Sequence, residues 1–248
     1  MFHISKRIIP KFKTGGGRYD SNLFFQLFIS LVGTVLGILL TVGITYYSDK
    51  HEKEVMARKV IMLTIHNLDV SINGMEQLVD ELDAQDSIFN YVREKHILKA
   101  AISADTLELF ISALYSHRIR PIDTSTEAIF SSNFEIWKYI DDPKVIGRIA
   151  NSYSLMNKCG EEYGRVEKEK YESFLSVYDQ LNSYQLQSDS ELVDELLKES
   201  KVLRVIDALP SEIALLRQLV KNAKALNNRN KSYLKVEQTE LDEIGNLM

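Results

Sequence analysis

The chain has 248 residues, of which 45% are hydrophobic and 26% charged, and its formal net charge is -5. Residues 1–20 hold five Lys and Arg residues and one acid, so 25 basic and 34 acidic residues remain downstream. An acidic surface repels phosphate backbones, which argues against a nucleic-acid-binding protein. The single cysteine, Cys159, excludes an intrachain disulfide and a metal cluster built from cysteines.

A long uncharged apolar segment lies near the N-terminus. Residues 23–47 contain no Asp, Glu, Lys or Arg, and Asp20 and Asp49 bound them. As a helix this segment spans roughly 37 Å at about 1.5 Å per residue, more than a hydrocarbon core of ~30 Å. The sequence therefore predicts a transmembrane helix over 23–47, preceded by a basic segment over 1–22.

The apolar segment differs from a cleaved signal peptide. It is longer than the apolar region of a signal peptide, and the first alanine is Ala57, so no A-x-A cleavage pattern precedes that residue. We therefore expect an uncleaved anchor. Five Lys and Arg residues precede the segment and four follow it closely, which favours a cytoplasmic N-terminus. The C-terminal part would then lie in the periplasm of a Gram-negative cell, anchored to its inner membrane.

Small residues repeat every four positions inside the predicted transmembrane helix. This glycine–threonine face consists of Gly33, Gly37, Thr41 and Thr45. Small side chains allow two helix backbones to approach closely, so that van der Waals contacts and hydroxyl hydrogen bonds hold them together. The face is a candidate for self-association of the transmembrane helix.

The remainder of the chain is predicted to be all-helical. Residues 48–248 contain only five glycines and three prolines and show no alternating β-branched runs. We expect a juxtamembrane amphipathic helix over 48–95 and a helical body over 96–248 that together form one domain. The fold class is all-α, with the transmembrane helix continuing into a bundle of five or six helices.

An apolar stripe runs along the juxtamembrane helix with alternating spacings of four and three residues, as in three heptads. It consists of Ile61, Ile65, Leu68, Ile72, Met75, Val79 and Leu82. Two interpretations stay open: the core of an intramolecular bundle, or the seam of an intermolecular coiled coil. No helix breaker lies between Tyr47 and Asn73, so the transmembrane helix is expected to run straight into this one.

Further helices are expected along the body. The patterns predict helices over 104–117 and 145–157, from Gly164 to about Leu186, and over 190–209. A last apolar register is interrupted by the polar run NNRNK. That register consists of Leu209, Ile213, Leu216, Val220 and Ala223.

The sequence carries no recognisable catalytic or metal-binding motif. His51-Glu52 begins like a zinc-protease helix, but Val55 stands where the second histidine ligand belongs. No G-x-S-x-G occurs, and Cys159 lacks the local signature of a thiol nucleophile. We expect no catalytic, cofactor-binding or metal-binding residues, and therefore a protein that is not an enzyme.

Two stretches resemble an uncharacterised family of small single-pass membrane proteins of Bacteroidota. They are TVLGILLTVGITYYSDKHEKE, residues 34–54, and STEAIFSSNFEIWKYIDDPKVIGRIANSYSLMNK, residues 125–158. The chain departs from the family pattern at Thr45, Tyr46 and Tyr47, where the family usually has Asn-Asn-Trp. The resemblance implies the single-pass topology with a helical body and implies no activity.

These observations favour a membrane-anchored interaction or scaffold protein. Its helical domain would bind a protein partner or a second copy of the chain at the membrane, without nucleic acid. The alternative is an extracytoplasmic sensory domain that binds a small ligand and acts through a separate transducer, because only about 20 residues lie on the other side of the membrane.

Overall fold

The structure is a computed structural model, and it describes residues 21–117, 125–132, 134–140, 142–181, 188–236 and 239–240. The side chains of residues 21–31 are outside this description. The basic segment predicted over 1–22 therefore lies almost entirely outside the described residues.

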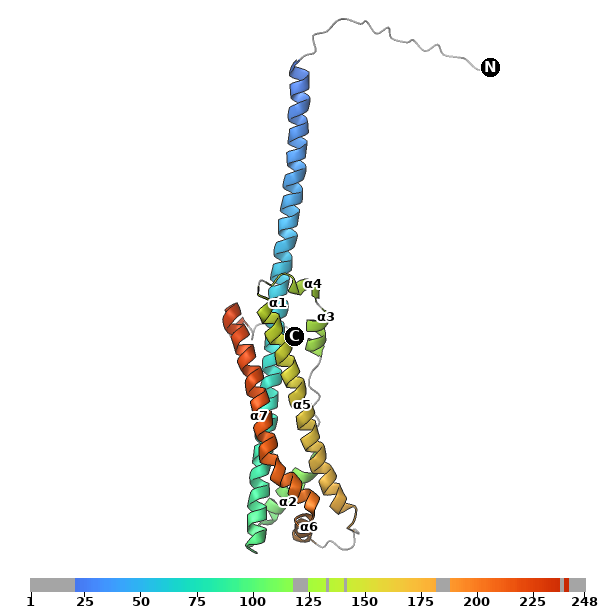
Figure 1. Cartoon of the computed structure of the whole chain (residues 1–248), viewed down its shortest axis with the longest axis vertical. Coiled ribbons are helices and arrows are strands. Elements are labelled where there is room, and N and C mark those ends of the chain that lie inside the picture. Colours follow the sequence, from blue (N-terminus) through green and yellow to red (C-terminus); the bar gives the residue numbers. More distant parts are fainter. Residues whose placement is uncertain are drawn as a thin grey trace, which may run out of the picture. The chain divides into compact units, whose positions relative to one another are not determined.

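Every element in the described part of the chain is a helix, so the predicted all-α class is confirmed (Figure 1). Seven helices are assigned there, and α4 is a single turn of four residues. Their bounds are α1 Ser21–Ile97, α2 Ala104–Tyr115, α3 Ser125–Ser132, α4 Phe134–Trp137, α5 Pro143–Tyr178, α6 Asp189–Leu196 and α7 Ser200–Leu234.

The chain divides into two compact units, Met1–Glu52 and Lys53–Met248. We call the second the bundle unit. α1 is one uninterrupted helix that begins in the first unit and ends in the second. The division falls close to residue 48, where the helical domain is predicted to begin.

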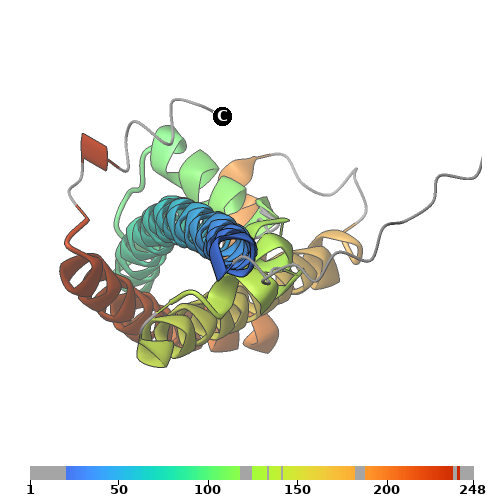
Figure 2. The same cartoon turned by 90° about the horizontal axis from the view of Figure 1, so that it is seen from above.

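Three long helices lie side by side in the bundle unit: residues 53–97 of α1, α5 and α7 (Figures 1 and 2). α2 and α6 lie at the end of the bundle where α1 ends, whereas α3 and α4 lie near the start of α5 (Figure 1). Trp137 of α4 is held against α3, because its Nε1 donates a hydrogen bond to the Phe130 carbonyl at 2.8 Å.

The apolar stripe forms the core of the bundle unit. None of its seven residues is more than 5% exposed, and Ile65, Leu68 and Leu82 are completely buried. At about 25 cal/mol per Å², burial of such side chains contributes about 1.5–3 kcal/mol each. The stripe is thus buried within one chain, which favours the intramolecular interpretation over an intermolecular seam.

α5 corrects one prediction from the sequence. The two helices expected over 145–157 and from Gly164 onward are a single helix of 36 residues. The Asp142 side chain caps its start by accepting a hydrogen bond from the Lys144 amide at 2.9 Å, and Pro143 occupies the first turn. Glycine inside a helix costs only about 1 kcal/mol, and the buried face of α5 offsets that cost.

A second correction concerns α6 and α7. The helix predicted over 190–209 is interrupted, because α6 ends at Leu196 and α7 begins at Ser200. α7 then continues through Pro210, although proline lacks the amide that a helix interior uses. Leu209 and Ile213, which flank it, are both buried, so tertiary packing maintains the helix there.

The polar run NNRNK interrupts the apolar register of α7, as the sequence indicates, and the helix continues through it to Leu234. Asn227 and Asn230 occupy the next positions of the register, and both are completely buried. The Asn227 amide donates to the Ile65 carbonyl at 3.1 Å and to Asp69 Oδ1 at 2.8 Å, both on α1. These partners compensate the loss of water around the buried amide nitrogen of Asn227.

A ladder of ion pairs joins α1 to α7. Lys224 Nζ lies 2.7 Å from Glu76 Oε2. Three of the four pairs recur every seven residues along both helices, and the fourth lies ten residues farther on. The rungs are Asp69–Lys231, Glu76–Lys224, Asp83–Arg217 and Arg93–Asp207. In the first three rungs the acid belongs to α1 and the base to α7. The regular spacing fixes an antiparallel register of the two helices.

Candidate functional site

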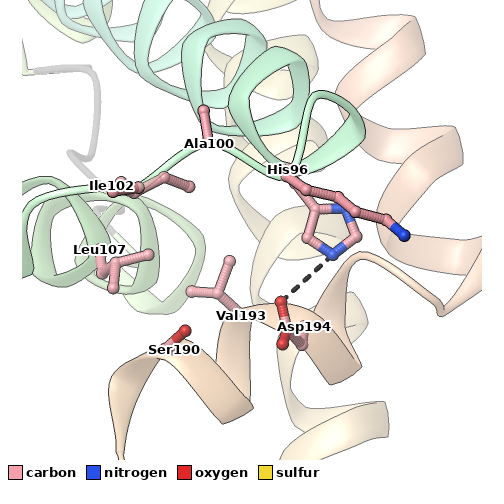
Figure 3. A pocket seen from close by; sticks show the side chains of 9 residues that line it. His96, Ala100, Ile102, Leu107, Ser190, Val193 and Asp194 are labelled. Carbon is pink, nitrogen blue, oxygen red and sulfur yellow. Dashed lines mark ion pairs between the residues drawn. The ribbon is translucent and has the colours of Figure 1, made fainter.

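A pocket opens at the end of the bundle unit where α1 ends (Figure 3). It has a volume of about 520 Å³ and is lined by residues of α1, the following loop, α2 and α6. We call it the end pocket. Its lining residues are His96, Lys99, Ala100, Ala101, Ile102, Leu107, Ser190, Val193 and Asp194.

The loop between α1 and α2 is shaped by the way α1 terminates. Lys99 has a left-handed backbone conformation with φ of 50°, and the Ala100 amide donates back to the Lys95 carbonyl at 2.9 Å. Four residues later Ser103 caps α2, its hydroxyl accepting from the Thr106 amide at 3.3 Å. The chain therefore turns back sharply, and the turn forms one wall of the end pocket.

His96 and Asp194 connect two walls of the pocket. His96 Nε2 of α1 lies 3.2 Å from Asp194 Oδ1 of α6, and the two side chains face each other in Figure 3. Both remain partly exposed, at 35% and 50%. Beside them Ile102, Leu107 and Val193 supply an apolar part of the lining. The pocket thus offers an apolar wall, a carboxylate, an imidazole, an ammonium and a hydroxyl. This set of groups suits a ligand that has both apolar and polar parts.

A buried ion pair that the sequence analysis missed lies where α2 packs against α5. Lys170 and Glu167 of α5 are 0% and 1% exposed, and Lys170 Nζ lies 2.5 Å from Glu167 Oε1. The same ammonium donates to Gln85 Oε1 of α1 at 2.5 Å and to the Ala113 carbonyl of α2 at 3.2 Å. One side chain therefore ties three helices together. The pair reads as an ordinary i, i+3 surface pair in sequence, so only the fold reveals its burial.

Cys159 has the environment of a structural thiol. It is completely buried, and burial raises its pKa to about 12. The thiol points toward the Leu216 carbonyl of α7 at 3.9 Å. A thiol at such a pKa is protonated at neutral pH, so it lacks the thiolate that a nucleophile or metal ligand requires.

The first unit contains the glycine–threonine face. Val32 to Tyr47 are exposed in the structure, and a Cβ atom added at Gly33 or Gly37 would meet nothing within 4 Å. The Thr41 hydroxyl donates to the Gly37 carbonyl at 2.8 Å, so it is bonded within its own helix. Gly33, Gly37, Thr41 and Thr45 therefore present a face that no described part of the chain covers.

By length and composition, α1 is the one helix in the described residues that could cross a membrane. The most apolar 18-residue stretch of that helix contains no buried residue. Among the described residues no group of three or more His, Cys, Asp and Glu side chains is placed to hold a metal ion.

Comparison with known proteins gives no relative: no family model, no curated protein and no solved structure matches the chain. The resemblance to a Bacteroidota membrane-protein family therefore stays a prediction, as do the expectations about activity and cofactors.

Proposed function

We propose that this chain is a single-pass membrane protein whose bundle unit serves as an interaction or scaffold domain. The observation that carries the proposal is the exposed apolar surface of α1. Leu36, Leu39, Leu40 and Ile44 are 54–68% exposed, in a segment without charges. Contiguous exposure of this kind is unfavourable in water and favourable in a hydrocarbon core.

The aromatic residues at the end of this segment support the proposal. Tyr46 and Tyr47 are 72% and 74% exposed, and only Ser48 separates them from Asp49, the first charged residue after the segment. Tyrosine is enriched at the interface between membrane and water, because its ring is apolar and its hydroxyl is polar. We place the N-terminus in the cytoplasm and the bundle unit in the periplasm, on the small excess of basic residues before the segment.

Fractionation of cells that produce the full chain tests the anchor. We expect the protein to stay in the membrane pellet after alkaline carbonate extraction and to enter the soluble phase only with detergent. Alkaline phosphatase fused after Met248 should be active if the bundle unit is periplasmic. A chain released by carbonate would overturn the anchor, and an inactive phosphatase fusion would overturn only the orientation.

The scaffold role has its own test, which is crosslinking of the full chain in native membranes. We expect a dimer of the chain or a defined heteromeric product. A chain that remains strictly monomeric and recovers no partner would overturn this role while leaving the anchor intact.

The sensory alternative is favoured by one observation, the end pocket, because its volume is in the range of small-molecule sites. Thermal unfolding of the detergent-solubilised chain across a metabolite panel separates the two functions. Stabilisation by one compound class that is lost in a Leu107→Glu variant would support the sensory function, and no stabilisation by any compound would count against it.

A further inference from the structure

We propose that the end pocket and the exposed residues beside it form a docking surface for a partner protein. The docked segment would place an apolar side chain in the pocket and a neighbouring Lys or Arg against the carboxylates around it. This inference rests on the proposed role as an interaction protein and names the surface and the chemistry of the partner.

The apolar half of the surface extends beyond the pocket. Ile97 and Leu98 stand in the chain between the lining residues His96 and Lys99, and they are 70% and 64% exposed. Inside the pocket Leu107 and Val193 approach each other from α2 and α6 (Figure 3). A small molecule in the pocket would leave Ile97 and Leu98 in water, whereas a polypeptide segment can cover them as well.

The negative charge of α2 and α6 favours a partner segment that contains Lys or Arg. α2 and α6 pack against each other and together contain six Asp and Glu residues and no Lys or Arg, and one of these acids, Glu195, is paired with Lys198 beyond the end of α6. Asp194 is itself part of the pocket lining and is half exposed. The pocket's own basic groups are Lys99 and His96, and His96 is already paired with Asp194. The excess of carboxylates favours Lys and Arg on the partner and steers its approach.

The experiment uses the full chain in lipid nanodiscs and a phage-displayed library of short random peptides as the probe. Phages that bind empty nanodiscs are removed first, so that the membrane and its lipids do not contribute. Selected peptides are then synthesised with a fluorescent label, and their affinity is measured by anisotropy at low and at physiological salt. We expect the selected peptides to share a large apolar residue next to Lys or Arg, and their binding to weaken as salt increases.

Two variants test the surface, and each has a matched control. Leu98→Asp removes apolar contact, and Val70→Asp makes the same change at an α1 residue that is 58% exposed. Asp194→Asn removes a negative charge from the pocket, and its control, Glu161→Gln, removes a negative charge from an exposed position of α5. We expect Leu98→Asp and Asp194→Asn each to weaken binding about tenfold, with the controls unchanged. Circular dichroism of every variant checks that the helices are retained.

The outcomes separate this inference from the proposed function. Peptides that lack basic residues, or that bind the Leu98→Asp and Asp194→Asn variants as well as the original chain, would overturn the docking surface. The docking surface would also be overturned if the selection yields no peptide while a small metabolite stabilises the original chain but not the Leu107→Glu variant. In each of these cases the carbonate extraction and the crosslinking in native membranes could still succeed, so the failure would belong to the docking surface alone.

Discussion

The ammonium of Lys170 and the carboxylate of Glu167 lie 2.5 Å apart inside the bundle unit, where both side chains are buried. Removing two charges from water costs several kcal/mol, and their mutual attraction offsets this only when the remaining hydrogen-bonding groups are also satisfied. Gln85 of α1 and the Ala113 carbonyl of α2 satisfy the ammonium. One ammonium therefore links α1, α2 and α5.

Removal of one partner should be strongly destabilising. Lys170→Met leaves the Glu167 carboxylate buried without its counter-ion, and we expect a loss of about 3–5 kcal/mol in the free energy of unfolding. Trp137, the only tryptophan, lies in the bundle unit and is 6% exposed, so guanidinium denaturation followed by its fluorescence measures this loss. Lys168→Met on the exposed side of α5 is the control, with an expected change below about 0.5 kcal/mol.

Replacement of both charges should recover most of the stability. In the double variant Glu167→Leu, Lys170→Met no buried charge remains, so the free energy of unfolding should return to within about 1–2 kcal/mol of the original. The hydrogen bonds to Gln85 and Ala113 would be lost. If the single Lys170→Met variant were already as stable as the original chain, the pair would contribute nothing to holding the three helices.

The ladder between α1 and α7 predicts compensating charge reversals. Glu76→Lys places two ammonium groups opposite each other, and we expect a loss of about 0.5–1 kcal/mol because both side chains of the pair are partly exposed. Adding Lys224→Glu should restore the stability. The control exchanges the charges of Lys168 and Glu172, an ion pair that lies within α5 and does not join two helices. A double-mutant cycle by denaturation, repeated in about 1 M salt, should show the coupling decrease through screening.

The core of α1 could be predicted from the sequence because it depends on local periodicity. Spacings of four and three residues place Ile61 to Leu82 on one side of a helix, and that side is buried. The same periodicity continues on α7, where the polar residues Asn227 and Asn230 interrupt the apolar register but are buried. Their burial requires partners on α1 and α5, Asp69 and Arg148 respectively, which are distant in the chain.

The ladder did carry a signal in the sequence. Its acids Asp69, Glu76 and Asp83 follow the stripe residues Leu68, Met75 and Leu82 by one position, and the bases of α7 repeat at the same seven-residue interval. A search for complementary heptads would have paired α1 with α7. The end pocket had no such signal, because its lining comes from three helices and a loop whose meeting depends on tertiary packing.

The glycine–threonine face predicts a selective effect on self-association. Gly37→Ile adds a side chain that meets nothing in a single chain, so folding of the monomer should be unaffected. On a shared interface the added bulk separates the two backbones, and we expect crosslinked dimer in membranes to fall about fivefold or more. Gly43→Ile, equally free of contacts but off the four-residue repeat, is the control. An equal loss in both variants would show that the face plays no part.

The Cys159 thiol predicts a pH dependence with a definite sign. Burial raises its pKa to about 12 from the ordinary value of 9.0, so the unfolded chain ionises at a lower pH than the folded one. The contribution of the neutral thiol is fully present below pH 9 and is lost progressively between pH 9 and about 12. In the Cys159→Ala variant the free energy of unfolding should decline less between pH 9 and about 12 than in the original chain. The cavity left by the missing sulfur lowers the stability of the variant by the same amount at every pH, so it does not affect this comparison.

The reactivity of the Cys159 thiol gives a second test. In the original chain Ellman's reagent should react slowly at pH 8 and rapidly after guanidinium is added, because the folded thiol is both buried and protonated. A rapid reaction of the native chain would contradict the burial of the thiol between α5 and α7.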